Sequence, residues 1–391
     1  MSTLWKVSRN RPHVFPKLKQ VRIYLKWLRY VLFITLDGRP YVVVNMDETC
    51  ISSAAAPKKG LMMPPAVRNP RGWRRRPGGQ DRTNTKTTLL AVACDQPDLQ
   101  PYLPQVILSR YTAHAIPPAW AQELYDASGM PFEYWHRSNG SVTPAIFIRW
   151  ATRLRSVVHS FNNTVWILLI LDCSSVHLDL RSMLHLQRLG ILCVVLPHKC
   201  TWLLQLLDVY VFAELKTRLH QSMAAERMRN EDWRPARGSW VGHCARAARD
   251  IVVNRDWSDH FDRLGTALDV DQLRPEVRQY VGDDPLDPAL PTRAEFARLT
   301  HRQPHTEGTA TLHRTIMRTI IRTQTRGHDA LPPQGAVHAL EHVLPAVARA
   351  GPPVPAADWA AVVGNFLDNQ EQLGLPPDAH HGRAPAVQLV L

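Results

Sequence analysis

Two hydrophobic patterns alternate along the first half of the chain. Continuous apolar runs predict buried strands, and apolar residues that recur every three or four positions predict helices with one face on the core. Strands are expected at residues 41–46, 87–95, 104–109, 164–171 and 191–197. The order of strand, hairpin, helix, strand, helix, strand and helix predicts a mixed α/β sheet with parallel crossovers covered by helices.

The helical pattern occurs in four segments. They are residues 17–32, 141–161, 180–190 and 201–220. Either Ser141 or Thr143 can act as the N-cap of the second helix. The fourth helix is expected to be continuous and to place Leu204, Leu207 and Val211 on its apolar side.

The composition changes after about residue 222. The remainder is rich in Arg, Ala and Pro, and turn signals such as LPPQG and GPPVP interrupt it. We expect this part to be mainly helical and partly disordered. The predicted organisation is a basic N-terminal helical segment (1–40), a central α/β domain (41–222) and a C-terminal region (223–391).

Composition and charge narrow the class of protein. Of 391 residues, 45% are hydrophobic and 21% are charged, which is typical of a globular protein. The net charge of +13 favours a polyanionic partner, most commonly nucleic acid, although a soluble basic protein without such a partner has the same charge.

The six cysteines form no CxxC pair and no zinc-type spacing, so we expect a reducing compartment. No secretory signal is expected at the N-terminus. The apolar stretch at residues 23–36 contains Lys26 and Arg29 and is too short to span a bilayer, so we expect a soluble protein without a membrane partner.

Three aspartates adjoin these apolar elements. Asp47 follows the first strand run, Asp172 directly follows the fourth, and Asp208 lies in the last predicted helix. Burying a carboxylate is costly unless a cation pairs with it, and two or three aspartates are sufficient to hold magnesium for phosphodiester chemistry. Any single one of them could equally be a capping or surface residue. Glu48 should point to the opposite face of the strand and is expected to be structural.

Two basic segments are candidate nucleic-acid contacts. The first combines arginines for phosphate with a tryptophan for stacking on a base, and a solvated loop is the alternative. Its residues are Arg68, Arg71, Trp73, Arg74, Arg75 and Arg76. The second is a series of arginines at every fourth position that would form one stripe on a helix. Its residues are Arg314, Arg318, Arg322 and Arg326.

Three further residues lie close to the aspartates in sequence. His177, His198 and Lys199 are candidate contacts to substrate phosphate, and the histidines could also touch a metal-bound water. A hydrogen-bonded structural role is the alternative for both histidines.

The motifs NMDET, LLILDxxxxH and LPxxxTxLLQxLDVxVFxxLK, in this order and spacing, resemble the DDE transposase domain of the pogo, Tigger and jerky type. The resemblance covers residues 40–220. It implies a ribonuclease H-like fold, two Mg²⁺ (or Mn²⁺) ions held by a triad of Asp47, Asp172 and Asp208, DNA as the substrate, and a nuclear location. A homodimer is also expected.

The chain departs from this pattern at two positions. Cys173 stands where the family commonly has Asn, and Leu206 stands where it has Pro. No tandem helix-turn-helix module is evident near the N-terminus. The sequence therefore leaves two hypotheses: a metal-dependent DDE endonuclease that cleaves and joins DNA, or a catalytically inactive relic of a transposase that only binds nucleic acid.

Overall fold

The apolar runs form the strands of one mixed sheet. The computed structural model describes residues 18–52, 86–109, 132–136, 141–230, 237–267, 269–281, 285–325 and 388–389. The strands are β1 (Tyr41–Ser52), β2 (Lys86–Cys94), β3 (Val106–Ser109), β4 (Glu133–His136), β5 (Trp166–Leu171), β6 (Ile191–Val195) and β7 (Gln388–Leu389). Their order across the sheet is β6-β5-β1-β2-β3-β4-β7.

Strand β1 lies inside the sheet, between β5 and β2. It is antiparallel to β2 and parallel to β5, where Asn45 pairs with Ile170, and the predicted hairpin is the antiparallel pair of β2 and β3. Strand β6 continues the parallel side next to β5. Residue 171 ends β5, so Asp172 leaves the sheet beside β1, as the sequence predicted.

The strand pattern differs from the prediction in two respects. Strand β1 continues to Ser52 because β2 pairs with it along that whole length, so Asp47 lies within the strand and not at its end. Strands β4 and β7 were not predicted. β4 has four residues and β7 has two, which is too short for a clear hydrophobic period.

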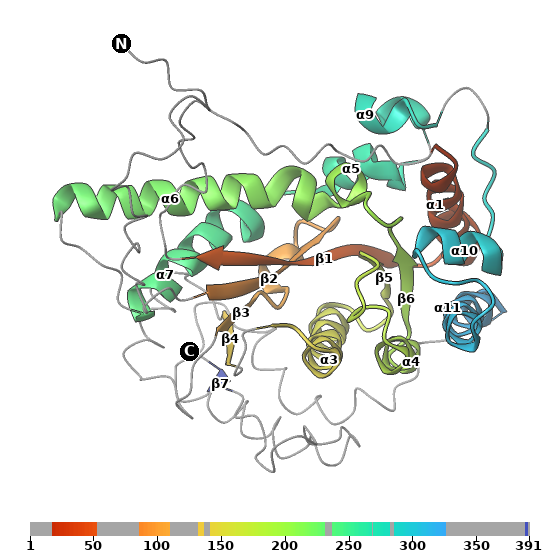
Figure 1. The fold of residues 1–391 in the computed structure, drawn as a ribbon, viewed down its shortest axis with the longest axis horizontal. Helices are drawn as coiled ribbons and strands as arrows, with labels where there is room; N and C mark the ends of the chain where they lie inside the picture. Colours follow the sequence, from red (N-terminus) through yellow and green to blue (C-terminus); the bar gives the residue numbers. More distant parts are fainter. Residues whose placement is uncertain are drawn as a thin grey trace, which may run out of the picture.

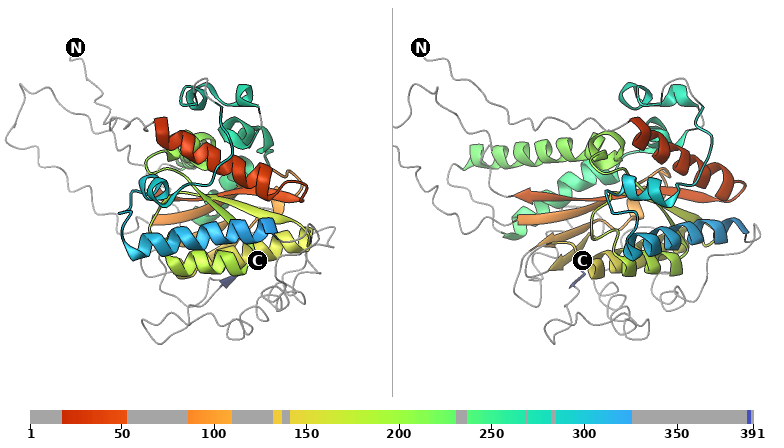
Figure 2. Two further views of the ribbon diagram at one scale, coloured as in Figure 1. Left: turned by 90° about the vertical axis from the view of Figure 1, so that its right-hand side faces the viewer. Right: turned by 45° about the vertical axis from the view of Figure 1, so that its right-hand side comes forward.

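Helices cover both faces of the sheet (Figures 1 and 2). In Figure 1, α3, α4 and α11 lie below the sheet, whereas α6 lies above it. The α-helices are α1 (Leu18–Tyr30), α3 (Pro144–Phe161), α4 (Leu180–Arg188), α5 (Thr201–Leu204), α6 (Phe212–Arg229), α7 (Arg237–Ala248), α8 (Ser258–Phe261), α9 (Pro275–Arg278), α10 (Arg293–Leu299) and α11 (Glu307–Thr325). A mixed sheet with this strand order and helices on both faces is the ribonuclease H-like α/β fold expected from the sequence.

Shorter turns complete the helical elements. They are the π-helical turns η1 (Val31–Thr35), η4 (Leu207–Val211), η5 (Arg249–Val253) and η6 (Asp262–Thr266), and the 3₁₀ turns η3 (Gln100–Tyr102) and η7 (Val270–Gln272). Thr143 is the N-cap of α3, because its hydroxyl accepts a bond from the Ile146 N–H.

The predicted continuous helix at residues 201–220 is wrong. Gln205 has an extended backbone (φ −93°, ψ 116°) that separates α5 from η4, and α6 follows η4. Asp208 therefore lies in the first turn of a new helical segment. The apolar period does not reveal such a break, because the residues on both sides of it are buried.

The helices after residue 223 pack on the same core as the sheet. One hydrophobic core includes Trp27 of α1, Trp166 of β5, Trp240 of α7 and Ile316 of α11. The prediction of a mainly helical C-terminal region is confirmed for the described residues, and residues 326–387 lie outside them. Where the chain divides into domains stays a prediction. No described helix combines the length and apolarity needed to cross a membrane.

Two glycines give a matched test of this packing. Gly265 has φ of +123°, and a Cβ on it would lie 2.5 Å from Cδ2 of Leu25. Gly308 is in the first turn of α11 and has no neighbour within 4 Å of that position. We expect Gly265→Ala to lower the free energy of unfolding by about 1–3 kcal/mol, whereas Gly308→Ala should raise it by up to about 1 kcal/mol. Urea unfolding of both variants measures this, and equal effects would contradict the packing of η6 on α1.

Candidate active site

Asp47 is a carboxylate inside the sheet. Only 8% of it is exposed, and its Oδ1 accepts the N–H of Glu48 at 2.8 Å. Burial, together with the charges of Asp208, Glu48 and Asp172, raises the pKa of Asp47 to about 8, although the bond from the Glu48 N–H lowers it. The carboxyl therefore lies close to the other acids, and a cation beside it would favour its ionised form.

Asp172 is held at the end of β5 by two donors on one oxygen. Its Oδ1 accepts the N–H of Ser174 at 3.0 Å and lies 2.5 Å from Nδ1 of His177. Burial alone would raise the pKa of Asp172, but the bond and charge of His177, together with Ser174, hold this pKa below its ordinary value. Asp172 is therefore ionised at neutral pH.

His177 connects Asp172 to Glu48. Its Nε2 lies 3.2 Å from Oε1 of Glu48, and none of its surface is exposed. Burial would lower the pKa of His177, but the bonds to the two carboxylates outweigh burial and raise the pKa to about 10. The ring is an imidazolium that donates from both nitrogens. The burial of the ring and its bonds to Asp172 and Glu48 favour the structural alternative for His177, and its contact with nucleic acid stays a prediction.

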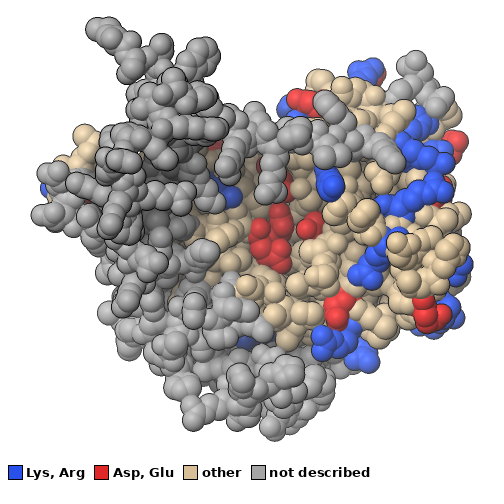
Figure 3. Space-filling model, in the orientation of Figure 1, with Lys and Arg blue, Asp and Glu red and all other residues tan. Residues whose placement is uncertain are grey.

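Asp208 is the most accessible of the three aspartates and lies in the first turn of η4. Partial desolvation raises its pKa, and the charge of Asp172 adds to this, whereas the Thr201 hydroxyl and Lys216 lower it. In Figure 3, acidic side chains gather in the middle of the molecular face, over β1. Asp47, Asp172 and Asp208 together are called the acidic site below.

The acidic site is a candidate metal centre. Its carboxylate oxygens are the donors that magnesium prefers. Among the described residues, however, no three His, Cys, Asp or Glu side chains are arranged so that they could hold a metal ion together. Like charges repel, and His177 and Ser174 turn one oxygen of Asp172 towards themselves. The donor chemistry fits a divalent cation, but the three side chains do not form a closed set of ligands.

A second group of residues lies next to Asp172. The ring of His198 stacks on that of His301, with centroids 4.9 Å apart and an interplanar angle of 11°. Nδ1 of His198 lies 3.5 Å from Sγ of Cys173. Lys199, which is exposed, and His301 are the two non-glycine residues with positive φ in the described part of the chain. His301 was missed by sequence reasoning, because it lies in no motif and far from the aspartates in sequence.

The remaining predicted contacts divide into two sets. Arg68, Arg71, Trp73 and Arg74–Arg76 lie outside the described residues. The arginine stripe is on α11, where Arg314, Arg318 and Arg322 are all exposed, and Arg326 lies outside the described residues. None of these three exposed arginines forms an ion pair within the described part of the chain.

Comparison with known proteins agrees with part of this picture. The family of DDE superfamily endonucleases matches residues 86–237. The matched segment contains Asp172 and Asp208 and begins after β1, so it does not include Asp47. No curated protein and no solved structure matches the chain. Over the matched segment, the chain is similar to DDE superfamily endonucleases.

The raised pKa of Asp47 predicts a pH-dependent cost of folding. The unfolded carboxyl ionises near pH 4, and the folded one keeps its proton up to about pH 8. The stability that it contributes is complete below pH 4 and is lost as the pH rises through 8. We therefore expect Asp47→Asn to match the wild type near pH 4 and to exceed its free energy of unfolding by roughly 1–3 kcal/mol near pH 9. A difference that stays constant across this range in urea unfolding would contradict the burial of Asp47 beside the other acids.

Proposed function

We propose that this chain is a DDE endonuclease of the pogo, Tigger and jerky type, which binds DNA and carries out metal-dependent hydrolysis and strand transfer. One observation carries the proposal. Three aspartates from three separate elements lie close enough for their charges to interact, at the sheet edge where β5 ends beside β1. The match to DDE superfamily endonucleases includes two of these three residues.

The roles follow from the chemistry of each group. Asp47, Asp172 and Asp208 would hold two Mg²⁺ or Mn²⁺ ions, which supply Lewis-acid activation of the nucleophile and stabilise the leaving oxygen. Asp172 is kept ionised and oriented by His177 and Ser174. Water and then a freed 3′ hydroxyl would attack in successive in-line displacements, without a covalent enzyme intermediate.

Two surfaces support DNA as the substrate. His198, Lys199 and His301 offer a stacked aromatic pair and an ammonium group beside Asp172, which suits a nucleotide next to the cleaved bond. On α11, three exposed arginines at every fourth position suit a row of phosphates. Figure 3 shows Lys and Arg gathered along the side of the molecule where α10 and α11 lie.

The alternative is a catalytically inactive relic that only binds nucleic acid. Cys173 favours it, because burial raises the pKa of its thiol to about 11, which leaves a neutral group against His198 where the family commonly has an amide. Nuclear location and a homodimer stay predictions.

Removing one charge from the acidic site tests the enzyme against the relic. We expect Asp172→Asn to reduce nicking of a labelled DNA duplex with Mg²⁺ or Mn²⁺ to background and to leave DNA binding intact, because the amide keeps the shape but not the charge. Asp179→Asn is the matched control, since Asp179 caps α4 and asparagine caps helices equally well. Cys173→Asn should raise nicking by restoring the amide. If neither the wild type nor Cys173→Asn nicks DNA with either metal, the relic is correct.

The arginine stripe of α11 predicts how DNA affinity responds to salt. We expect replacement of Arg314, Arg318 and Arg322 with Ala to weaken binding and to reduce the slope of log K against log salt by about 2–3, because each phosphate contact contributes about 0.9. The control triple variant replaces Arg229, Arg255 and Arg278 with Ala and so removes the same amount of positive charge. Unlike the arginines of α11, these three are ion-paired, with Glu226, Glu214 and Asp271 respectively. Fluorescence anisotropy at several salt concentrations measures both. Equal slopes for the two triple variants would show that α11 does not contact phosphate.

A further inference from the structure

We propose that Asn45 is a positioning residue whose buried amide fixes the three elements that carry the aspartates relative to one another. The inference rests on the proposed function, because it concerns the same acidic site. It adds a residue that neither the sequence motifs nor the match to DDE superfamily endonucleases assigns to any role.

The amide of Asn45 bonds to both neighbouring elements. Its Nδ2 donates to the carbonyl of Ile170 at 3.0 Å, and its Oδ1 accepts the N–H of Leu207 at 3.2 Å. Only 1% of Asn45 is exposed. Each of the three residues lies one or two positions before an aspartate: Asn45 before Asp47, Ile170 before Asp172, and Leu207 before Asp208.

The bond to Leu207 explains how the helix can restart there. The extended backbone of Gln205 interrupts the helix, so the first N–H groups of η4 have no partner within their own helix. Asn45 satisfies one of them from the adjoining strand, as an N-cap residue would do within the chain. The Nε2 of Gln205, just before η4, approaches the carbonyl of Met46 at 3.5 Å, and its Oε1 has no hydrogen-bond partner among the described residues. The bond from Leu207 to Asn45 is therefore shorter than the bond from Gln205 to the same strand.

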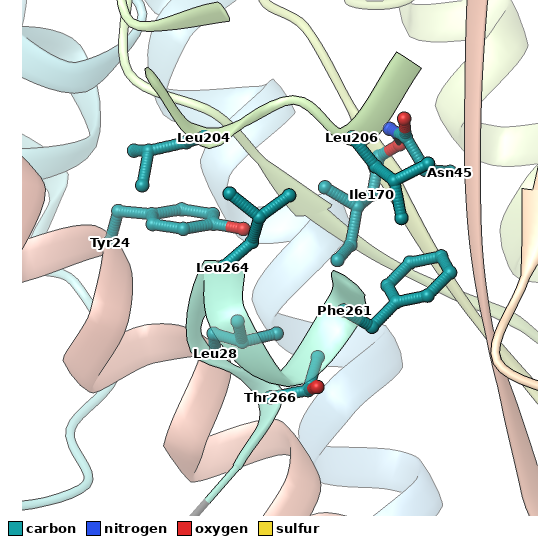
Figure 4. A pocket seen from close by; sticks show the side chains of 9 residues that line it. All are labelled: Tyr24, Leu28, Asn45, Ile170, Leu204, Leu206, Phe261, Leu264 and Thr266. Carbon is teal, nitrogen blue, oxygen red and sulfur yellow. Dashed lines mark hydrogen bonds between the residues drawn. The ribbon is translucent and has the colours of Figure 1, made fainter. Parts of the chain in front are cut away.

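The surroundings of Asn45 leave no good substitute for its amide. Figure 4 shows Asn45 beside Ile170 and Leu206, on a pocket that is otherwise lined mainly by apolar side chains such as Phe261 and Leu264. Without the amide, the Ile170 carbonyl and the Leu207 N–H would be buried without a partner. Separation of η4 from β1 would then let water reach them, and this movement would carry Asp208 away from Asp47.

The test compares two buried side-chain amides, one on β1 and one on η3. Asn45→Leu keeps the approximate volume and removes both bonds. Gln100→Met is the matched control: Gln100 is 1% exposed and bonds to Val92, Cys94 and Val252, which lie on β2 and η5 and not on the elements that Asn45 connects. Both variants lose buried hydrogen bonds, so a general loss of stability, followed by thermal unfolding, should appear in both.

Two measurements separate positioning from stability. We expect Asn45→Leu to bind Mn²⁺ at least about 10-fold more weakly than the wild type in a calorimetric titration, and Gln100→Met to bind it normally. We also expect amide hydrogen exchange across residues 206–212 to increase in Asn45→Leu and to be unchanged in Gln100→Met.

The outcomes distinguish this inference from the proposed function. The role of Asn45 would be overturned if Asn45→Leu exchanged its amide hydrogens across residues 206–212 at the wild-type rate. It would also be overturned if Gln100→Met showed an equal increase. Both conclusions hold whatever the Mn²⁺ affinity. If the wild type binds no Mn²⁺, the metal-dependent function fails, and the exchange measurement alone decides whether Asn45 positions η4. Increased exchange with normal Mn²⁺ affinity would also overturn the proposal, because the bond would then not place the aspartates.

Discussion

The structure depends on one constraint: partly buried carboxylates repel one another where β5 ends beside β1. Burial raises the pKa of both Asp47 and Asp208, and the charges of neighbouring carboxylates also act to raise both. The buried imidazolium of His177 supplies a positive charge here, and it binds both Asp172 and Glu48. Asp172 is consequently the one aspartate of the three with a lowered pKa. Lys216 offsets part of the charge of Asp208, and a divalent cation at the acidic site would offset more of the negative charge there.

Two residues, His177 and Asn45, therefore hold the acidic site in place by different kinds of interaction. His177 acts by charge and hydrogen bonds on Asp172, whereas Asn45 acts through neutral hydrogen bonds on the backbones that carry Asp172 and Asp208. Adjacent residues of a strand point to opposite faces, so Asp47 and Glu48 can serve different partners: Asp47 is coupled most strongly to Asp208, and Glu48 binds His177. A single segment of β1 thus contributes to both the acidic site and its support.

Most of the fold and part of the site could be predicted from the sequence. The strands at β1, β2, β3, β5 and β6 are continuous apolar runs, and burial on both faces produces this pattern directly. The position of Asp172 follows from it, because a charge ends the run. The break at Gln205 could not be predicted, since it depends on Asn45 and Met46, which are distant in sequence. The burial of His177 has the same origin: its carboxylate partners come from β1 and β5, and only the pairing of these strands brings them together.

The helix break at Gln205 depends on contacts with β1, and this affects how the replacement of proline by Leu206 should be interpreted. Leu206 stands where the family commonly has a proline, which would favour the start of a helix near Asp208. The helix nevertheless restarts at Leu207, directly before Asp208, because Asn45 accepts its N–H. Leu206 is buried against the same pocket, so it adds apolar contact where proline would add a fixed φ. The absence of proline is therefore compatible with a well-placed Asp208, and of the two departures from the family pattern Cys173, whose thiol lies against His198, is the one that favours a relic.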